Sequence, residues 1–143
     1  MRLSVTTPRG SLIDTDVEEV SAPGSLGEFG ILPGHIPFLS ALRPGVLAYR
    51  TKEGERVIAV SDGVLEVAQT SAGEKVLVLV AEAKAATTID RDAAAAEVLD
   101  ADKKLTDWKG DLGAEYQALV ARRAWAEARL NAVAKSGHNG PAH

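Results

Sequence analysis

The residues that could do chemistry are few, and no motif groups them. His35 is the one histidine outside the C-terminal tail, and the chain has no cysteine. A zinc or iron site needs several ligands at helix or strand spacing, and none accompany His35. Glu28 could form a carboxylate pair with Asp62 or Glu66, but nothing in the sequence fixes their separation. We expect no metal ion and no catalytic residue, and we interpret His35 as hydrogen-bonded within a Gly-Pro turn.

Short catalytic motifs are missing as well. The sequence contains no GxSxG nucleophile elbow, no Walker A loop and no GxGxxG dinucleotide fingerprint. Ser61-Asp62-Gly63 resembles a turn and not a catalytic group. A small β-barrel enzyme is therefore the weaker hypothesis, and a binding or structural protein is favoured.

Composition narrows the class further. The chain of 143 residues carries a formal net charge of −4, which gives no general footprint for nucleic acid. The longest aliphatic run, VLVLVA at 76–81, is far too short to cross a bilayer, and the N-terminal MRLSVTTPRG lacks the apolar run of a signal peptide. We expect no nucleic-acid partner and no direct membrane insertion. The absence of cysteine fits the cytoplasm.

The stretch GEFGILPGHIPFL, residues 27–39, combines loop punctuation with apolar side chains. Its glycines and prolines predict a rigid loop, yet both phenylalanines of the chain, Phe29 and Phe38, lie here. A rigid loop loses little entropy on docking, so its apolar residues would form a preorganised contact patch. The alternative is that these side chains point inward. We expect both: some fill the end of a barrel, while the loop with Glu28 and His35 meets a partner.

The elements that must position this loop are strands. Residues 1–86 read as strands of about six residues separated by turns every ~8–12 residues. This pattern predicts an antiparallel β-sandwich or barrel, complete by Ala81. LIDTDVEEVSA, residues 12–22, reads as a single strand. The near-continuous apolar run at 76–81 predicts a strand that is covered on both faces.

Residues 87–135 read as a helical hairpin. Asp90 or Asp92 can cap the first helix, and the glycines of KGDLG, residues 109–113, end it. A second helix follows from Ala114 to about Lys135, and the short break makes the two helices antiparallel. We expect the polar residues 136–143 to form a flexible tail.

Charge divides the two helices. Residues 91–115 carry a net charge of −3 and residues 116–143 a net charge of +3. Arg122, Trp125 and Arg129 recur at i, i+3 and i+7, a stripe that suits an acidic partner. The alternative is a solvated face whose arginines bridge to the first helix, and charge runs more often mean that. Alanine-rich helices bury little apolar area, so we expect a weakly held hairpin that needs a docking surface and could use more than one.

GEFGILPGHIPFLSALRPGVL at 27–47, followed by SDGVLEV at 61–67, resembles the epsilon subunit of bacterial F-type ATP synthases, whose mitochondrial counterpart is called delta. The early VTTPRG, the chain length and the C-terminal helices match too. The resemblance implies an α+β fold: an antiparallel β-sandwich of about ten strands, often called a flattened barrel, at residues 1–86. It places an antiparallel two-helix hairpin at 87–135.

The resemblance also implies a function without chemistry. It indicates a central-stalk rotor subunit, bound to gamma and seated on the c ring at the cytoplasmic face of the bacterial plasma membrane. The residues expected to contact the c ring or gamma are Glu28, Phe29, Ile31, Pro33 and His35. In the family the helices fold against the sandwich, or extend along gamma into the catalytic head of alpha and beta subunits and block ATP hydrolysis. The residues expected to make that inhibitory contact are Arg122, Arg123, Trp125 and Arg129.

Some family members bind ATP at the folded hairpin through a motif of the form Ile/Leu-Asp-x-x-Arg-Ala. Ile89 and Asp90 match its first two positions, but Ala93 stands where the motif has arginine. Arg91 lies two positions earlier, about 200° around a helix, and cannot simply substitute. The resemblance therefore implies at most a weak nucleotide site at Ile89 and Asp90, and we expect no cofactor. The alternative function is a nucleotide-sensing module that binds ATP at the hairpin.

Overall fold

Within residues 1–139, ten strands precede two α-helices. The structure is a computed structural model, and it describes residues 1–139. The strands are β1 (Arg2–Thr7), β2 (Gly10–Asp16), β3 (Glu19–Gly24), β4 (Gly27–Ile31), β5 (Phe38–Leu42), β6 (Gly45–Thr51), β7 (Gly54–Val60), β8 (Gly63–Thr70), β9 (Gly73–Val80) and β10 (Ala83–Ala85). The short 3-10 helix η1 (Ala86–Thr88) leads into the helices α1 (Arg91–Thr106) and α2 (Ala114–Asn139).

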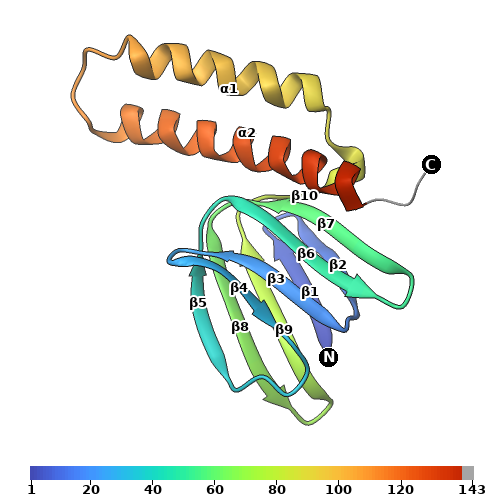
Figure 1. Ribbon diagram of the computed structural model, residues 1–143. Helices are drawn as coiled ribbons and strands as arrows, with labels where there is room; N and C mark the ends of the chain where they lie inside the picture. Colours follow the sequence, from blue (N-terminus) through green and yellow to red (C-terminus); the bar gives the residue numbers. More distant parts are fainter. Residues whose placement is uncertain (140–143) are drawn as a thin grey trace.

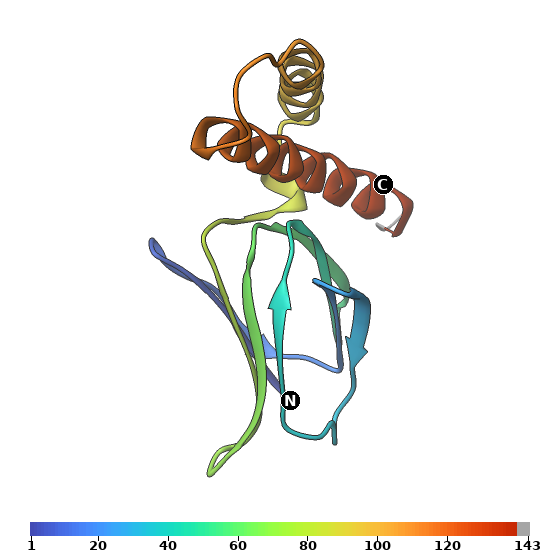
Figure 2. The same ribbon diagram turned by 90° about the vertical axis from the view of Figure 1, so that its left-hand side faces the viewer.

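The strands form one sheet that folds on itself as a flattened barrel, with the helical hairpin lying outside it (Figures 1 and 2). The strand order is β10-β7-β6-β3-β5-β8-β9-β1-β2, and β4 pairs with β3 beside this path. The pairs between neighbouring strands are antiparallel except that β1 and β9 run parallel. The expected sandwich of about ten strands followed by two helices is confirmed, with this parallel pair as an unforeseen feature.

The core follows from the alternation of side chains along each strand. In β9, Val76, Val78 and Val80 are buried, whereas Leu79 points outward and is 49% exposed. The prediction that the run 76–81 is covered on both faces is wrong. The reason is that α2 packs on β6 and β7, which leaves the outer face of β9 without a helix among residues 1–139.

The stretch predicted as one strand at 12–22 is two strands, β2 and β3. Between them the Val17 N–H donates to the Met1 carbonyl and the Glu18 N–H donates to the Arg50 carbonyl, each at 2.8 Å. β2 pairs with β1, whereas β3 pairs with β4 and β6. The chain therefore changes partners at this point, a long-range event that local alternation does not reveal.

Local capping explains where α1 begins. The carboxylate of Asp90 accepts a hydrogen bond from the Ala93 N–H at 3.0 Å and so satisfies one of the free donors of the first turn. Asp92 lies in that same turn, where its negative charge interacts favourably with the positive end of the helix dipole.

α2 is longer than the sequence suggested. It runs to Asn139, so residues 136–139 of the expected tail are helical, and residues 140–143 lie outside the described residues. Ser136 and residues of β7 line one groove, so these last turns lie beside the sandwich. That support explains why the helix continues beyond Lys135.

The hairpin docks through a small apolar cluster that is separate from the main core. Ala132 of α2 packs with Ala48, Val57 and Ala59 of the sandwich and with Ala86 of η1. The partly buried side chains at the edge of this cluster are Val46, Ile89 and Trp125. The main core is formed by larger residues inside the sandwich, and these include Leu3, Ile31, Leu47, Ile58 and Leu65. The interface is therefore a thin layer of alanine and valine with Ile89 and Trp125 at its edge.

Candidate interaction surfaces

The loop between β4 and β5 contains a tight turn at Pro33-Gly34. The His35 N–H donates to the Leu32 carbonyl at 3.1 Å, which closes the turn. Proline fixes its own φ near −65°, and Gly34 adopts a φ of +89°, the combination that a type II turn requires. Pro33 and Gly34 therefore specify one backbone conformation for this turn.

Aromatic side chains tie this loop to the end of the barrel. The His35 and Phe38 rings lie 5.5 Å apart between centroids, and the Phe38 and Phe29 rings 5.3 Å apart, both edge to face. Phe29 and Phe38 are partly buried against the main core. The Nδ1 atom of His35 lies 2.7 Å from the Ile36 carbonyl, so His35 is hydrogen-bonded within the turn, as interpreted from the sequence.

The loop presents apolar side chains outward. Leu32 is 57% exposed and Ile36 is 72% exposed, and Pro33 is exposed between them. Ile31, however, is fully buried and belongs to the main core. This corrects its expected place among the contact residues, because alternation along β4 turns Ile31 inward. The loop therefore offers Leu32 and Ile36 as contacts that the sequence analysis did not single out.

Glu28 does not lie beside His35. It sits on β4, opposite Pro23 of β3, and lines a groove between the sandwich and α2. The other charged residues of that groove are Arg43, Arg123 and Glu127. The structure thus separates two residues that the sequence analysis placed in one contact surface: His35 belongs to the loop, and Glu28 faces the helical hairpin.

A second surface with exposed apolar side chains lies on the outer face of β5, β8 and β9, where Glu66 of β8 is exposed opposite Leu39. Val64 pairs with Ala41 on one side and with Leu79 on the other, and Leu39 lies two positions along β5. Leu39, Val64 and Leu79 are all exposed. Sequence reasoning missed this surface because it read the apolar run of β9 as covered. The useful signal was that neighbouring strands also carry apolar residues on both faces.

The arginines of α2 bridge to α1. Arg129 pairs with Glu97, and Arg123 pairs with Asp102 and with Glu127 of its own helix. Hydrogen bonds to Asp102 and Glu127 raise the pKa of the Arg123 guanidinium. Nearby, the Arg122 guanidinium lies 3.6 Å from a carboxylate oxygen of Asp100. The structure therefore shows the bridging arrangement that was the alternative to a free cationic stripe.

Trp125 lies against the sandwich, where it borders the docking cluster. The guanidinium carbon of Arg129 lies 5.4 Å from the centre of the Trp125 ring, a cation–π distance. Arg129 is 15% exposed at its side chain, so it is held between the indole and Glu97. The proposed inhibitory residues Trp125 and Arg129 are thus turned inward in this pose.

The residues of the partial ATP motif have structural contacts of their own. Asp90 caps α1 through the N–H of Ala93, the residue that replaces the motif arginine. Ile89 borders the docking cluster, and Arg91 lies 3.4 Å from the carboxylate of its exposed neighbour Asp92.

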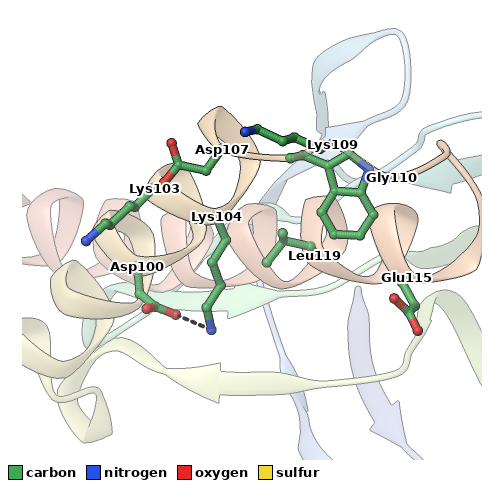
Figure 3. A pocket seen from close by; sticks show the side chains of 9 residues that line it. Asp100, Lys103, Lys104, Asp107, Lys109, Gly110, Glu115 and Leu119 are labelled. Carbon is green, nitrogen blue, oxygen red and sulfur yellow. Dashed lines mark ion pairs between the residues drawn. The ribbon is translucent and has the colours of Figure 1, made fainter.

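An open groove surrounds the turn between α1 and α2, with a volume of about 620 Å³ (Figure 3). Its walls include three lysines and three acids, so no net charge is concentrated there. Figure 3 shows Lys104 paired with Asp100, at 3.1 Å, and Glu115 on the far side of the turn. Most of the residues that line the groove are therefore charged, and its large apolar side chains are Trp108 and Leu119.

Residues 1–139 contain no group of three or more histidine, aspartate or glutamate side chains arranged to hold a metal ion. Neither helix in this range combines the length and apolar character that spanning a membrane demands.

Comparison with known proteins defines the class. The family described as "ATP synthase, Delta/Epsilon chain, beta-sandwich domain" matches residues 1–86, which span all ten strands. The chain is also 34% identical to the ATP synthase epsilon chain 2 of Syntrophotalea carbinolica over 137 residues, which cover 96% of each chain. It is 43% identical over 110 residues to the ATP synthase epsilon chain of Trichlorobacter lovleyi, covering 74% of this chain and 76% of the relative. This chain belongs to the ATP synthase epsilon chain family.

Solved structures share the fold. A chain of the Euglena gracilis mitochondrial ATP synthase, in a structure of OSCP, F1 and the c ring, superposes with a TM-score of 0.67 at 21% identity, covering 96% of this chain and 80% of that one. A chain from the central stalk and c ring of the Tetrahymena thermophila mitochondrial ATP synthase gives 0.60 at 20% identity, covering 93% and 96%. Both of these chains therefore share the fold of this chain.

Proposed function

We propose that this chain is a non-catalytic rotor subunit in the central stalk of a proton-translocating F-type ATP synthase. The observation that carries the proposal is that one chain presents two exposed apolar surfaces. One is the turn-containing loop from Leu32 to Ile36, and the other is the outer sheet face at Leu39, Val64 and Leu79. Contiguous exposed apolar surface on a small protein marks a site of protein association. Family membership supplies the assembly in which that association occurs.

The two surfaces suit two partners. The outer face of β5, β8 and β9 is a broad sheet surface that suits gamma, whereas the narrow loop with Pro33 and His35 suits the c ring. The two solved chains that share the fold come from a structure of OSCP, F1 and the c ring and from a structure of the central stalk and c ring, which supports this assignment. The chain then works peripherally at the cytoplasmic face of the bacterial plasma membrane, held there by its partners.

The helical hairpin is proposed to regulate ATP hydrolysis. Its contact with the sandwich is thin, and α1 is held mainly through α2. Release of the hairpin would free Arg122, Arg123 and Arg129 from their α1 partners and expose Trp125. These side chains could then meet an acidic segment of the catalytic head. The ion pairs that stabilise the folded pose thus also keep the inhibitory arginines from contacting the catalytic head.

We propose further that this hairpin moves without sensing ATP. Ala93 occupies the motif position of arginine, and its N–H serves to cap the helix through Asp90. Arg91 lies beside the carboxylate of Asp92, which would repel a phosphate.

Co-purification tests the main proposal. Tagged full-length chain, mixed with purified gamma and c ring, should elute with both. A matched variant, Val64→Asp with Leu79→Asp, should lose gamma while it retains the sandwich fold by circular dichroism. A wild-type chain that elutes alone would refute the rotor assignment.

A further inference from the structure

A carboxylate from a different hairpin holds the Pro33-Gly34 turn. Both carboxylate oxygens of Glu74 lie 3.0 Å from the Gly34 nitrogen, whose N–H donates to them. Glu74 stands near the start of β9, 40 residues away along the chain. The Gln69 side chain, directly opposite on β8, donates to Glu74 at 3.0 Å and so orients the carboxylate.

This contact links the loop to the rest of the sheet. The other hydrogen bonds made by residues 32–37 within the described chain stay inside the loop: His35 N–H to the Leu32 carbonyl, and the His35 ring to the Ile36 carbonyl. β8 and β9 are the longest strands of the sandwich, with 8 residues each, so their hairpin reaches the level of the turn. Glu74 thus connects the loop to a stiff two-stranded support.

We infer that Glu74 is a positioning residue that holds Leu32 and Ile36 in the arrangement that docks. This inference rests on the proposed function, in which the loop contacts the c ring. A hydrogen bond from an amide to a carboxylate is stronger than one between neutral groups. A loop that is already ordered loses less entropy on binding, so its partner binds more tightly. Because Glu74 is only half-buried, water competes for its hydrogen bonds, and we expect it to have a moderate effect on the order of the loop and on its affinity.

The test measures loop order and affinity separately in the full-length chain. In Glu74→Ala, hydrogen exchange at the Gly34 amide, followed by NMR, should quicken about tenfold. Affinity for a purified gamma–c-ring complex should fall about three- to tenfold. Glu74→Gln keeps one acceptor oxygen and should recover part of both losses. Glu53→Ala, at an exposed glutamate of the β6–β7 turn, is the matched control and should change neither quantity.

The outcomes separate this inference from the proposed function. Unchanged Gly34 exchange in Glu74→Ala overturns the inference whatever the affinity. Faster exchange with unchanged affinity also overturns it, since the contact would then be structural only. If the wild-type chain does not bind the complex, the proposed function fails, and Gly34 exchange alone decides whether Glu74 orders the loop. A fall in melting temperature that Glu74→Gln does not reverse would also overturn the inference, because Glu74 would then support the fold as a whole and not the loop.

Discussion

Arg129 and Trp125, one helical turn apart on α2, together contact both α1 and the sandwich. The Arg129 guanidinium carbon lies 5.4 Å from the centre of the indole, which borders the sandwich, and the same guanidinium pairs with Glu97 of α1. The docking of α2 on the sheet and the docking of α1 on α2 are therefore coupled through one side-chain pair. Loss of either contact should weaken the other.

Removing the indole should undock the hairpin. We expect Trp125→Ala to cost about 2 kcal/mol at this interface, less than the loss of a fully buried tryptophan, because the side chain is only partly buried. Hydrogen exchange should accelerate throughout α2 while the β-strand amides keep their protection. Trp108→Ala, at the far end of the hairpin, is the control. Equal acceleration in strands and helices would contradict the separation of the two apolar clusters.

Removing the acids of α1 and removing the arginines of α2 should change the rate of ATP hydrolysis in opposite directions. Neutralising α1 through Glu97→Gln, Asp100→Asn and Asp102→Asn frees the arginines, so ATP hydrolysis by the assembled enzyme should fall severalfold. Arg122→Ala, Arg123→Ala and Arg129→Ala remove the inhibitory contact, so hydrolysis should rise severalfold. Both sets remove the ion pairs between the two helices. The rate of ATP hydrolysis by the reconstituted complex tests whether the two sets act in opposite directions. Two changes in the same direction would sink the regulatory role of the arginines.

The sandwich should fold without the helices. A chain that ends after Thr88 keeps all ten strands and the main core, and loses only the cover over Ala48, Val57 and Ala59. We expect a cooperative unfolding transition and continued binding to gamma and the c ring. Circular dichroism and pull-down test this. An unfolded fragment would show that the docking cluster is part of the essential core.

Alkaline stability should depend on Tyr49. Burial raises the pKa of its phenol above 10.0, and nearby Arg56 only partly opposes this. The folded state therefore binds the phenolic proton more tightly than the unfolded state does. Stability from this group is complete below pH 10.0 and is lost as pH rises through the higher folded pKa. Denaturant midpoints above that pH should fall less in Tyr49→Phe than in wild type, with Tyr116→Phe as the control.

MgATP should bind weakly or not at all. With Ala93 in the motif position of arginine, calorimetry on the full chain should give no heat at micromolar nucleotide. Ala93→Arg is the informative variant, since it restores the motif. A micromolar dissociation constant in the wild type would favour the nucleotide-sensing alternative.

Local patterns predicted the elements well and their mutual placement less well. Period-two alternation and turn glycines indicated the sandwich. The charge split of the helices indicated, as the alternative to a stripe for an acidic partner, that arginines of the second helix bridge to the first, as Arg129 does to Glu97. Glu28 and His35 are close in sequence, yet they lie at different surfaces, because Glu28 is on β4 and His35 is in the loop that follows it. The contact between Glu74 and Gly34 spans 40 residues and depends on which strands are neighbours, which no local pattern contains.

The parallel pairing of β1 with β9 determines when the sheet can be completed during translation. β1 is synthesised before the other strands of the sandwich, yet its partner on one side ends only at Val80. Hairpins such as β6–β7 can form as they emerge, but the sheet cannot be completed until more than half of the chain has been translated. Contacts of such long sequence separation slow folding. The nascent protein must therefore carry an unfinished edge on β1 through most of the synthesis of its sandwich.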